Sequence, residues 1–356
     1  MKSYRKKFWF FFAVMVFSMT ARSIVAETIY VNGRAGSDKN PGTNNRPVKT
    51  IGRAAEIVNG GTEPGPTMIK IAPGIYNLTE SVGFGGTGQY TEKERLVIES
   101  TVLPDDPQWK PALMPVILST EDPRKQGGLD GLTATYGIKI AASHVTIRGI
   151  KFLGNPLARN WHNCISRIGD SLDDLLVTQC MFIGDKDVID IYAAVLATGD
   201  GFVVDHCVFR NCHACTVFWD GPRGIAGKSC SMRYCIVDGA YISGVWTCQT
   251  AEDFEFHHNI VTRSEYFWIR KRIDNPIKYQ VHDCIITGNE SYSGYGVESG
   301  PTGRTGDEVT YEERDIIKQG MIVLENDKKA RNYMHPAAGS PGSDLGAGLF
   351  SRQKEK

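Results

Sequence analysis

The sequence lacks the features that would place it in several common protein classes. Neither sign of charge dominates, because 40 Lys and Arg residues balance 40 Asp and Glu residues. A chain without an excess of positive charge is poorly suited to bind a nucleic-acid polyanion. Beyond the first 26 residues there is no apolar segment long enough to span a membrane, and no Pro- or Ser-rich linker divides the chain. These absences favour one domain that binds neither nucleic acid nor membrane.

Residues 1–26 have the pattern of a secretory signal peptide. A basic stretch (2–7) precedes the apolar run FWFFFAVMVF (8–17), and Ala26 is a suitable last residue before cleavage. The run is short for a membrane span, so an uncleaved anchor is the less favoured alternative. Removing the segment removes five basic residues and leaves 35 basic and 40 acidic ones, a net charge of −5. We therefore expect an exported protein, periplasmic or extracellular.

The sequence also lacks the 3.6-residue apolar spacing of long helices. Instead, one short phrase recurs between residues 145 and 289. The copies are VTIRGIKF (145–152), LVTQCMF (176–182), VVDHCVF (203–209), SMRYCIV (231–237), FEFHHNIV (254–261) and YQVHDCII (279–286). One apolar position aligns in all of them: Ile150, Cys180, Cys207, Cys235, Ile260 and Cys284. Steps of 24–30 residues are typical of a solenoid whose coils share one core.

A second apolar strand follows each copy of the phrase. The series is CISRI (164–168), VIDIY (188–192), CTVFW (215–219), YISGVW (241–246), YFWIR (266–270) and YGVES (295–299). Two or three short strands in each repeat fit a β-helix coil. A leucine-rich repeat would need a Leu spacing that is absent, and a propeller blade would need about 40 residues. Adjacent coils of such a β-helix would lie about 4.8 Å apart.

The chain has nine cysteines, an odd number, so in an oxidising compartment at least one thiol stays free. Four of them occupy the aligned position, where a buried thiol acts as a small hydrophobic side chain. The segment HCVFRNCHAC (206–215) has residue types that suit zinc, but Cys207 and Cys215 should point into the core. A local Cys212–Cys215 or Cys230–Cys235 bridge is the favoured alternative to zinc.

The two ends of the chain carry recognisable phrases. They are IYVNGRAGSDKNPGTNNRPVKTIGRAA (29–55), IKIAPGIY (69–76) and SPGSDLGA (340–347). The chain resembles the secreted right-handed parallel β-helix proteins of the pectate-lyase-like superfamily. The matching residues are Gly36, Ser37, Asp38, Asn40, Pro41, Gly42, Thr43, Pro47, Thr50, Ile51, Pro73, Gly74, Tyr76, Ser340, Pro341, Asp344 and Gly346. The resemblance spans residues 29–347 and implies carbohydrate chemistry, mostly that of polysaccharide lyases and glycoside hydrolases that act on acidic glycans.

We therefore expect an all-β fold, a single-stranded right-handed parallel β-helix with a short N-terminal capping helix. The helix is predicted in RPVKTIGRAAEIV (46–58), where one apolar face can cover the first coil. Asp38 in the preceding loop fits a turn, with a calcium site as the alternative. The predicted domain (27–350) comprises an N-terminal cap with the first strands (27–76), irregular loops (77–137), regular coils (138–297) and a C-terminal coil with an insertion (298–350), followed by a tail (351–356).

The resemblance implies that substrate lies along the outer face of one parallel sheet, which the second-strand series matches. Strand alternation then predicts that Asp190, Trp268 and Arg270 point outward. The predicted catalytic residues are Lys186, Asp190, His213, Glu265, Arg270 and Lys271. The predicted substrate-binding residues are Trp109, Asp220, Arg223, Tyr266 and Trp268. Trp109 is expected in a wall of the substrate groove, because long loops are often functional.

The first functional hypothesis is β-elimination on an acidic polysaccharide. A lyase must neutralise the uronate carboxylate, remove a proton and protonate the leaving oxygen. Lys186, His213, Arg270 and Lys271 are the candidate bases, and Asp187 and Asp190 are candidate calcium ligands. Tyr266 or Trp268 can stack on a sugar ring.

Two alternatives stay open. A glycoside hydrolase needs a pair of carboxylates, which Asp187, Asp190, Asp220 and Glu265 can supply. The Asn-Thr-Asp, Asp-Asp, Gly-His-Gly and Arg-Ile-Lys phrases of polygalacturonases are absent from these strands. The other alternative is a non-catalytic glycan-binding or surface protein. In each case we expect a monomer that contacts a polysaccharide, with Ca²⁺ as the one candidate cofactor.

Overall fold

The computed structural model describes residues 27–61, 67–85, 90–126, 134–157, 161–169, 171–221, 224–225, 227–248, 253–271, 279–297, 300–305 and 311–351. The predicted signal peptide (1–26) and all of the predicted tail except Ser351 lie outside these residues. Within the described ranges, no helix is both long and apolar enough to cross a membrane.

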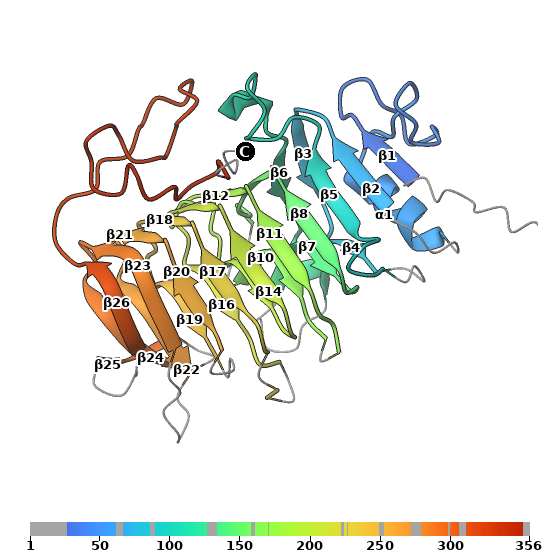
Figure 1. Ribbon diagram of the computed structural model, residues 1–356. Helices are drawn as coiled ribbons and strands as arrows, with labels where there is room; N and C mark the ends of the chain where they lie inside the picture. The colour runs from blue at the N-terminus through green and yellow to red at the C-terminus, as the bar shows by residue number, and fades with distance from the viewer. Residues whose placement is uncertain are drawn as a thin grey trace, which may run out of the picture.

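The chain winds as a parallel β-helix whose coils have three faces (Figure 1). The first face holds β1 (Glu27–Val31), β2 (Thr67–Ile71), β5 (Leu96–Ser100), β8 (Val145–Arg148), β11 (Leu175–Thr178), β14 (Phe202–Asp205), β17 (Ser231–Arg233), β20 (Glu255–His257), the start of β23 (Tyr279–Thr287) and β26 (Tyr311–Ile317). The second face holds β3 (Ile75–Leu78), β6 (Val116–Ser119), β9 (Lys151–Leu153), β12 (Met181–Ile183), β15 (Val208–Arg210), β18 (Ile236–Asp238), β21 (Ile260–Thr262) and the end of β23.

The third face is a separate sheet. It holds β4 (Val82–Phe84), β7 (Ala134–Ile140), β10 (Trp161–Arg167), β13 (Ala193–Ala197), β16 (Ala214–Phe218), β19 (Ser243–Thr247), β22 (Tyr266–Lys271), β24 (Ser291–Val297) and β25 (Gly300–Thr305), of which only β24–β25 is an antiparallel pair. Two 3₁₀ turns, Pro111–Leu113 and Pro123–Gln126, lie near β6. The prediction that residues 77–137 form irregular loops is wrong for β4, β5 and β6, which pair with regular coils.

The recurring phrase marks the corner between the first and second faces. One residue at each corner has a left-handed backbone: Gln179 (φ 54°), His206 (48°), Tyr234 (52°), His258 (55°) and Asp283 (51°). This conformation is uncommon for residues other than glycine, and here it turns the chain from one strand into the next. The following residue then points into the interior, as Cys207 and Cys235 do.

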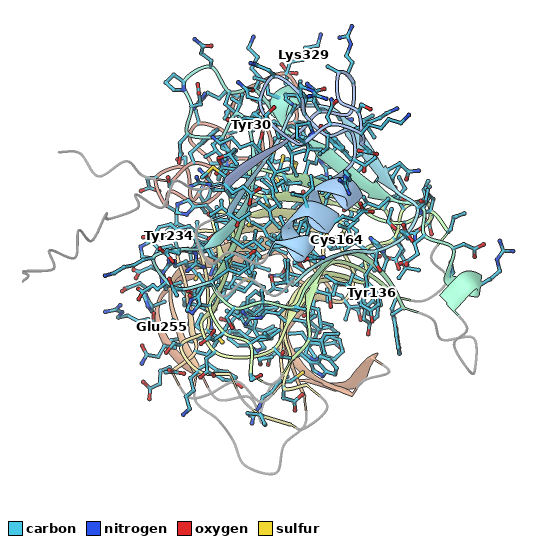
Figure 2. The ribbon with its side chains drawn as sticks, turned by 90° about the vertical axis from the view of Figure 1, so that its right-hand side faces the viewer. Tyr30, Tyr136, Cys164, Tyr234, Glu255 and Lys329 are labelled. Carbon is cyan, nitrogen blue, oxygen red and sulfur yellow. The ribbon has the colours of Figure 1, made fainter. Side chains whose placement is uncertain are left out.

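The interior ladder at this corner is hydrogen-bonded as well as apolar. Each thiol donates to a carbonyl oxygen of the preceding coil at 3.6–3.8 Å: Cys180 to Ile147, Cys207 to Val177, Cys235 to Val204 and Cys284 to Phe256. Because a thiol is a weak donor, each cysteine acts mainly by packing, and its hydrogen bond fixes the direction of the side chain. Figure 2 looks along the coil axis, with the core residue Cys164 near the centre and Tyr234 at the rim.

The assignment of Ile260 to this ladder is wrong by one residue. Ile260 pairs with Ile236 and Ile285 on the second face, so Asn259 occupies the ladder position. Asn259 is fully buried, and its Nδ2 donates to the Met232 carbonyl at 2.8 Å, as the thiols do on other coils. Its amide oxygen also accepts the Cys235 N–H at 2.8 Å. The sequence alignment followed an apolar position and so passed over Asn259, whose burial depends on these hydrogen bonds.

The predicted capping helix is confirmed as α1 (Ile51–Gly60), at the blue end in Figure 1. It buries the predicted face of Ile51, Ala54, Ala55 and Val58. Thr50 is the N-cap, and its hydroxyl accepts the Arg53 N–H at 3.1 Å. The Asp38 carboxylate accepts the N–H groups of Lys49 and Thr50, both at 2.9 Å, which is the predicted turn role.

The segment after β26 runs back along the second face (Figure 1, red). It covers an outer apolar row formed by the first residues of second-face strands: Met181, Val208, Ile236, Ile260 and Ile285. In the neutral His335 ring, Nε2 accepts the Leu349 N–H at 2.8 Å. The Gly348 N–H donates to the Tyr234 carbonyl, also at 2.8 Å. Trp109 packs in the same cluster, edge-on to Phe350 at 5.7 Å.

Trp109 is therefore a packing residue, and its predicted place in a groove wall is wrong. It is 1% exposed because the C-terminal segment folds over it, a contact between residues about 240 positions apart that no local pattern reveals.

All nine cysteines are buried and free, so neither Cys212–Cys215 nor Cys230–Cys235 forms a bridge. Cys207 and Cys215 point into the core as predicted, which separates them from any exposed zinc-binding group. Burial raises the pKa of Cys215 well above that of an ordinary thiol, so it stays protonated and inert.

Candidate active site

The candidate site lies where the strands of the third face begin. Aromatic side chains from four successive coils are in contact there. The ring centroids of Trp161 and Tyr192 are 5.6 Å apart, those of Tyr192 and His213 are 4.6 Å apart, and those of His213 and Tyr241 are 5.3 Å apart. Backbone hydrogen bonds keep these positions in step, because the Ala214 N–H donates to the Tyr192 carbonyl and the Ser243 N–H to the His213 carbonyl. All four side chains are partly exposed.

Asp190 lies beside this aromatic row, where the Tyr241 hydroxyl donates to its Oδ1. The predicted strand VIDIY is wrong in position, since β13 begins at Ala193 and Asp190 belongs to the turn before it. Burial raises the pKa of Asp190, against the opposing effect of the Tyr241 hydrogen bond. Burial and the adjacent Asp190 carboxylate together raise the pKa of Tyr241 far above its ordinary value, so its phenol keeps its proton.

The positively charged side chain of Lys186 lies near Tyr241 in the same group. Lys186 is at the tip of a tight turn closed by two backbone hydrogen bonds between Asp185 and Ile189, and its Nζ is 5.9 Å from the centroid of the Tyr241 ring. Burial, followed by the positive charge of Lys186, lowers the pKa of His213 to about 4. His213 is therefore neutral near neutral pH and able to accept a proton.

Glu265 completes the group two coils beyond His213, at the equivalent position before β22. Two coil spacings correspond to about 10 Å. Burial and the nearby Glu290 raise the pKa of Glu265, whereas Lys186 opposes them. The structure thus brings together four of the predicted residues, Lys186, Asp190, His213 and Glu265.

The predicted outward orientation of Trp268 and Arg270 is wrong. Strands of the third face contain two consecutive residues that both enter the core, such as Phe267 and Trp268 on β22. This break reverses the alternation, so Ile269 lies in the outer cluster while Trp268 and Arg270 are 0% and 1% exposed. The Trp268 indole N–H donates to the Thr247 hydroxyl at 2.9 Å, a core contact.

The other predicted residues are dispersed. Tyr266 lies on the outer face beside Glu265 but is only 7% exposed. Asp220 is 1% exposed and follows β16, at the opposite end of the strands from His213. Asp187 lies in the exposed turn next to Lys186. Arg223 and the side chain of Lys271 are outside the described residues.

Calcium binding stays a prediction. In the described ranges, neither Asp187 nor Asp190 belongs to a group of three His, Cys, Asp or Glu residues whose ligand atoms all lie within 4.8 Å of one another. Asp190 instead receives a proton donor, the Tyr241 hydroxyl. Because Ca²⁺ would need the same carboxylate oxygen that accepts this hydrogen bond, the contact favours a role in proton transfer over a role in calcium binding.

Sequence reasoning missed Trp161, Tyr192 and Tyr241. Each precedes or opens a third-face strand, at nearly the same place in its coil as His213. Counting positions from the interior ladder would have aligned Tyr241 with His213, because each lies six residues after its ladder residue, Cys235 and Cys207. The error in the position of β13 hid this alignment, because it put Tyr192 at the end of a strand.

Comparisons with known proteins find structures of similar fold but no protein that is similar in sequence. No family model matches the chain, and no curated protein matches it. The crystal structure of pectin methylesterase from Aspergillus niger matches with a TM-score of 0.51 at 14% identity, covering 91% of this chain and 95% of that one. The GH136 lacto-N-biosidase from Eubacterium ramulus matches with a TM-score of 0.50 at 8% identity, covering 82% and 68%.

These neighbours are right-handed parallel β-helix proteins, and the predicted fold is confirmed. At such low identity the likeness establishes the fold alone. Function must be argued from the side chains of the site, because one fold supports many reactions.

Proposed function

We propose that the protein is an exported enzyme that cleaves an acidic polysaccharide at the start of the third-face strands. The observation that carries the proposal is the convergence of a cation, a neutral imidazole, a phenol and two carboxylates: Lys186, His213, Tyr241, Asp190 and Glu265. Groups that can donate and accept protons, held beside an aromatic row, suit a reaction at a sugar ring. The fold supports the proposal, since the two solved structures above are named as carbohydrate-acting enzymes.

We assign the reaction to β-elimination, with one role for each group. Lys186 neutralises the uronate carboxylate, which makes the neighbouring C–H more acidic. Neutral His213 accepts that proton, because its lowered pKa keeps it unprotonated near neutral pH. Tyr241 protonates the leaving oxygen, and the Asp190 carboxylate orients the phenol through its hydrogen bond. Trp161 and Tyr192 supply ring faces against which sugars stack.

Glycoside hydrolysis is the second candidate, and a specific observation favours it. Asp190 and Glu265 both have raised pKa values, and a carboxyl with a raised pKa is the kind of group that acts as a general acid. In that reaction, one of the two carboxyls protonates the glycosidic oxygen as it leaves. The other, as a carboxylate on the opposite side of the ring, either bonds to the sugar carbon itself or deprotonates the water that does. His213 and Tyr241 then bind hydroxyls of the sugar.

The test is to incubate the purified protein with pectin, alginate and glycosaminoglycans, with and without calcium. β-Elimination gives unsaturated uronates, which absorb in the ultraviolet, whereas hydrolysis gives reducing ends without that absorbance. Release of methanol from pectin would point to ester cleavage instead. Binding without any product would favour the non-catalytic alternative, and neither product nor binding with any acidic glycan would refute the proposal.

Matched variants locate the activity. His213→Gln and Tyr241→Phe should abolish most of the turnover, while Tyr234→Phe makes the same change at the corner between the first and second faces and should leave it unchanged. If Tyr234→Phe and Tyr241→Phe behave alike, the site is elsewhere. The export of the protein is tested separately, by comparing the mass of the secreted chain with that expected after cleavage behind Ala26.

A further inference from the structure

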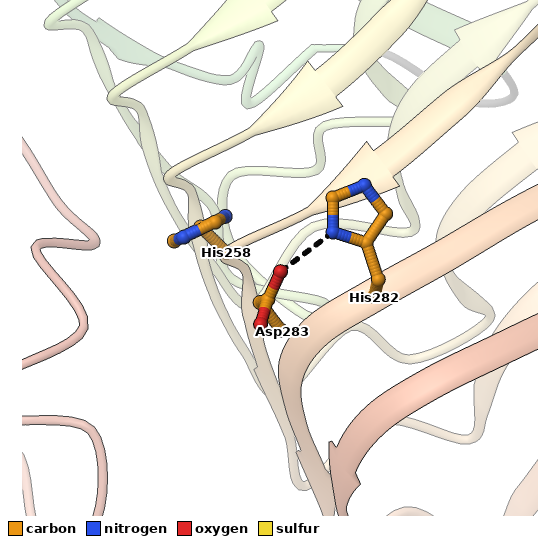
Figure 3. Close-up of side chains that lie close together, drawn as sticks. All are labelled: His258, His282 and Asp283. Atoms are coloured by element: carbon orange, nitrogen blue, oxygen red, sulfur yellow. Dashed lines mark hydrogen bonds and ion pairs between the residues drawn. The ribbon is translucent and has the colours of Figure 1, made fainter.

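A second group of chemically active side chains lies on another part of the molecule. It is at the corner between the first and second faces, on the coils of β20–β21 and β23. His257 pairs in register with His282, which places the corner residue His258 beside the corner residue Asp283. Figure 3 shows His258, His282 and Asp283 directed toward one another.

The left-handed corner explains why four outward side chains gather here. Phe256 and Asn259 enter the core, so His257 and His258 between them both face outward. On the next coil, the same arrangement directs the side chains of His282 and Asp283 outward. The rings of His257 and His282 stack with centroids 5.0 Å apart and planes 8° from parallel. Two adjacent coils thus form a two-by-two array of side chains.

We propose that His258, His282 and Asp283 bind a divalent transition-metal ion, with Zn²⁺ as the best match. One ligand atom from each lies within 4.8 Å of the other two, and all three residues are partly exposed. In the described part of the chain, no other group of three His, Cys, Asp or Glu residues meets this condition. Two imidazoles and one carboxylate are ligands that Zn²⁺ accepts readily, and three protein ligands leave one position for water.

The geometry requires only a small adjustment. His282 Nδ1 and the Asp283 carboxylate are 2.7 Å apart in a hydrogen bond. Ligands about 2.0–2.1 Å from a tetrahedral ion are about 3.3 Å from each other, so this pair would open by about half an ångström. The ion would replace the shared proton, and both residues would keep a favourable partner.

Nearby charges set the strength of the site. The Arg314 guanidinium is 3.8 Å from the Asp283 carboxylate, but its side chain is 69% exposed and can turn to Asp315, 3.7 Å away. Arg233 on the preceding coil is paired with Asp205 at 3.4 Å. His257 flanks the ligands, with its Nδ1 3.0 Å from that of His258.

The equivalent corner two coils earlier provides an internal comparison. There Asp205 and His206 form a similar pair, with a separation of 2.7 Å. The adjoining coil supplies Arg233 and Tyr234 instead of further metal ligands, and Tyr234 stacks on His206 at 4.8 Å. A pair without a third ligand should not hold the ion, which makes this corner the matched control.

The test uses the full-length purified chain after removal of bound metal by a chelator. Isothermal titration with ZnCl₂ should give one site, and CoCl₂ should give the visible absorption of a tetrahedral complex. His258→Asn, His282→Gln and Asp283→Asn should each weaken Zn²⁺ binding at least on the order of tenfold. Asn is used at the corners because it tolerates the left-handed backbone. His206→Asn makes the same change at the control corner and should retain the wild-type affinity.

Thermal unfolding gives an independent readout, because an ion that binds only the folded chain raises Tm. Zn²⁺ should raise Tm for the wild type and for His206→Asn, and should not do so for the three ligand variants. The proposal is overturned if no stoichiometric Zn²⁺ binding occurs, or if the ligand variants bind as tightly as the wild type while their circular dichroism is unchanged. Glycan cleavage plays no part in these measurements, so the outcome is independent of the proposed enzyme activity.

Discussion

Substituting Asn259 with alanine should destabilise the β-helix by about 2–6 kcal/mol. The side chain is fully buried and joins two coils, since its Nδ2 donates to the Met232 carbonyl and its Oδ1 accepts the Cys235 N–H, both at 2.8 Å. Alanine leaves both backbone groups buried without a partner. Each such group costs about 1–3 kcal/mol, which gives the range for two.

Two further substitutions separate hydrogen bonding from packing. Asn259→Cys restores the residue that other coils use. Its thiol would donate to the same carbonyl position, and its sulfur would weakly accept the Cys235 N–H, as Cys284 Sγ accepts the Asn259 N–H at 3.4 Å, so the cost should be at most about half as large. Asn289→Ala removes the same pair of bonds, to Val261 and Ser264, at a partly exposed site. Water can replace those bonds, so that variant should lose no more than about 1.5 kcal/mol.

The measurement is equilibrium urea unfolding followed by circular dichroism, with equal m-values as the condition for comparing midpoints. Because a solenoid can unfold coil by coil, hydrogen exchange at the Cys235 amide gives a local readout. The reasoning is refuted if Asn259→Ala is no worse than Asn289→Ala, or if Asn259→Cys costs as much as alanine.

Tyr241→Phe removes the donor to Asp190 and should lower kcat by about 10²–10⁴-fold with an unchanged fold, measured on the glycan that gives product; an unchanged kcat would exclude Tyr241 as the acid. Burial lowers the pKa of His335 to about 4, so the neutral ring that accepts the Leu349 N–H stabilises the docked C-terminal segment above pH 6.5, and this stability is lost as the pH falls toward 4. Amide exchange at Leu349 should accelerate over that interval, and a flat profile would contradict the assignment. Thr50→Ala removes the N-cap of α1 and should lower the free energy of unfolding by about 1 kcal/mol, measured by urea unfolding. Thr50→Ser keeps the hydroxyl and should retain most of that stability. Equal losses in the two variants would mean that the hydroxyl is not the cap.

The candidate site was predictable in part. Lys186, His213 and Glu265 each lie six residues after the ladder residue of their coil, and Asp190 lies in the same repeat as Lys186. Parallel coils bring such places together. Tyr192 was missed because the strand of its sheet was placed too early in the coil that contains Asp190. Arg270 and Trp268 were assigned to the wrong face, since two consecutive residues of β22 enter the core and reverse the alternation.

The sequence by itself determined the solenoid and its cap. A repeat of 24–30 residues and the apolar face of α1 are local signals that need no knowledge of distant contacts. Only the tertiary structure decided which side chains meet. The corner geometry put Asn259 in the interior ladder and set His258 beside Asp283, and the returning C-terminal segment buried Trp109. These outcomes depend on backbone angles and on contacts between distant residues, which a pattern of residue types does not encode.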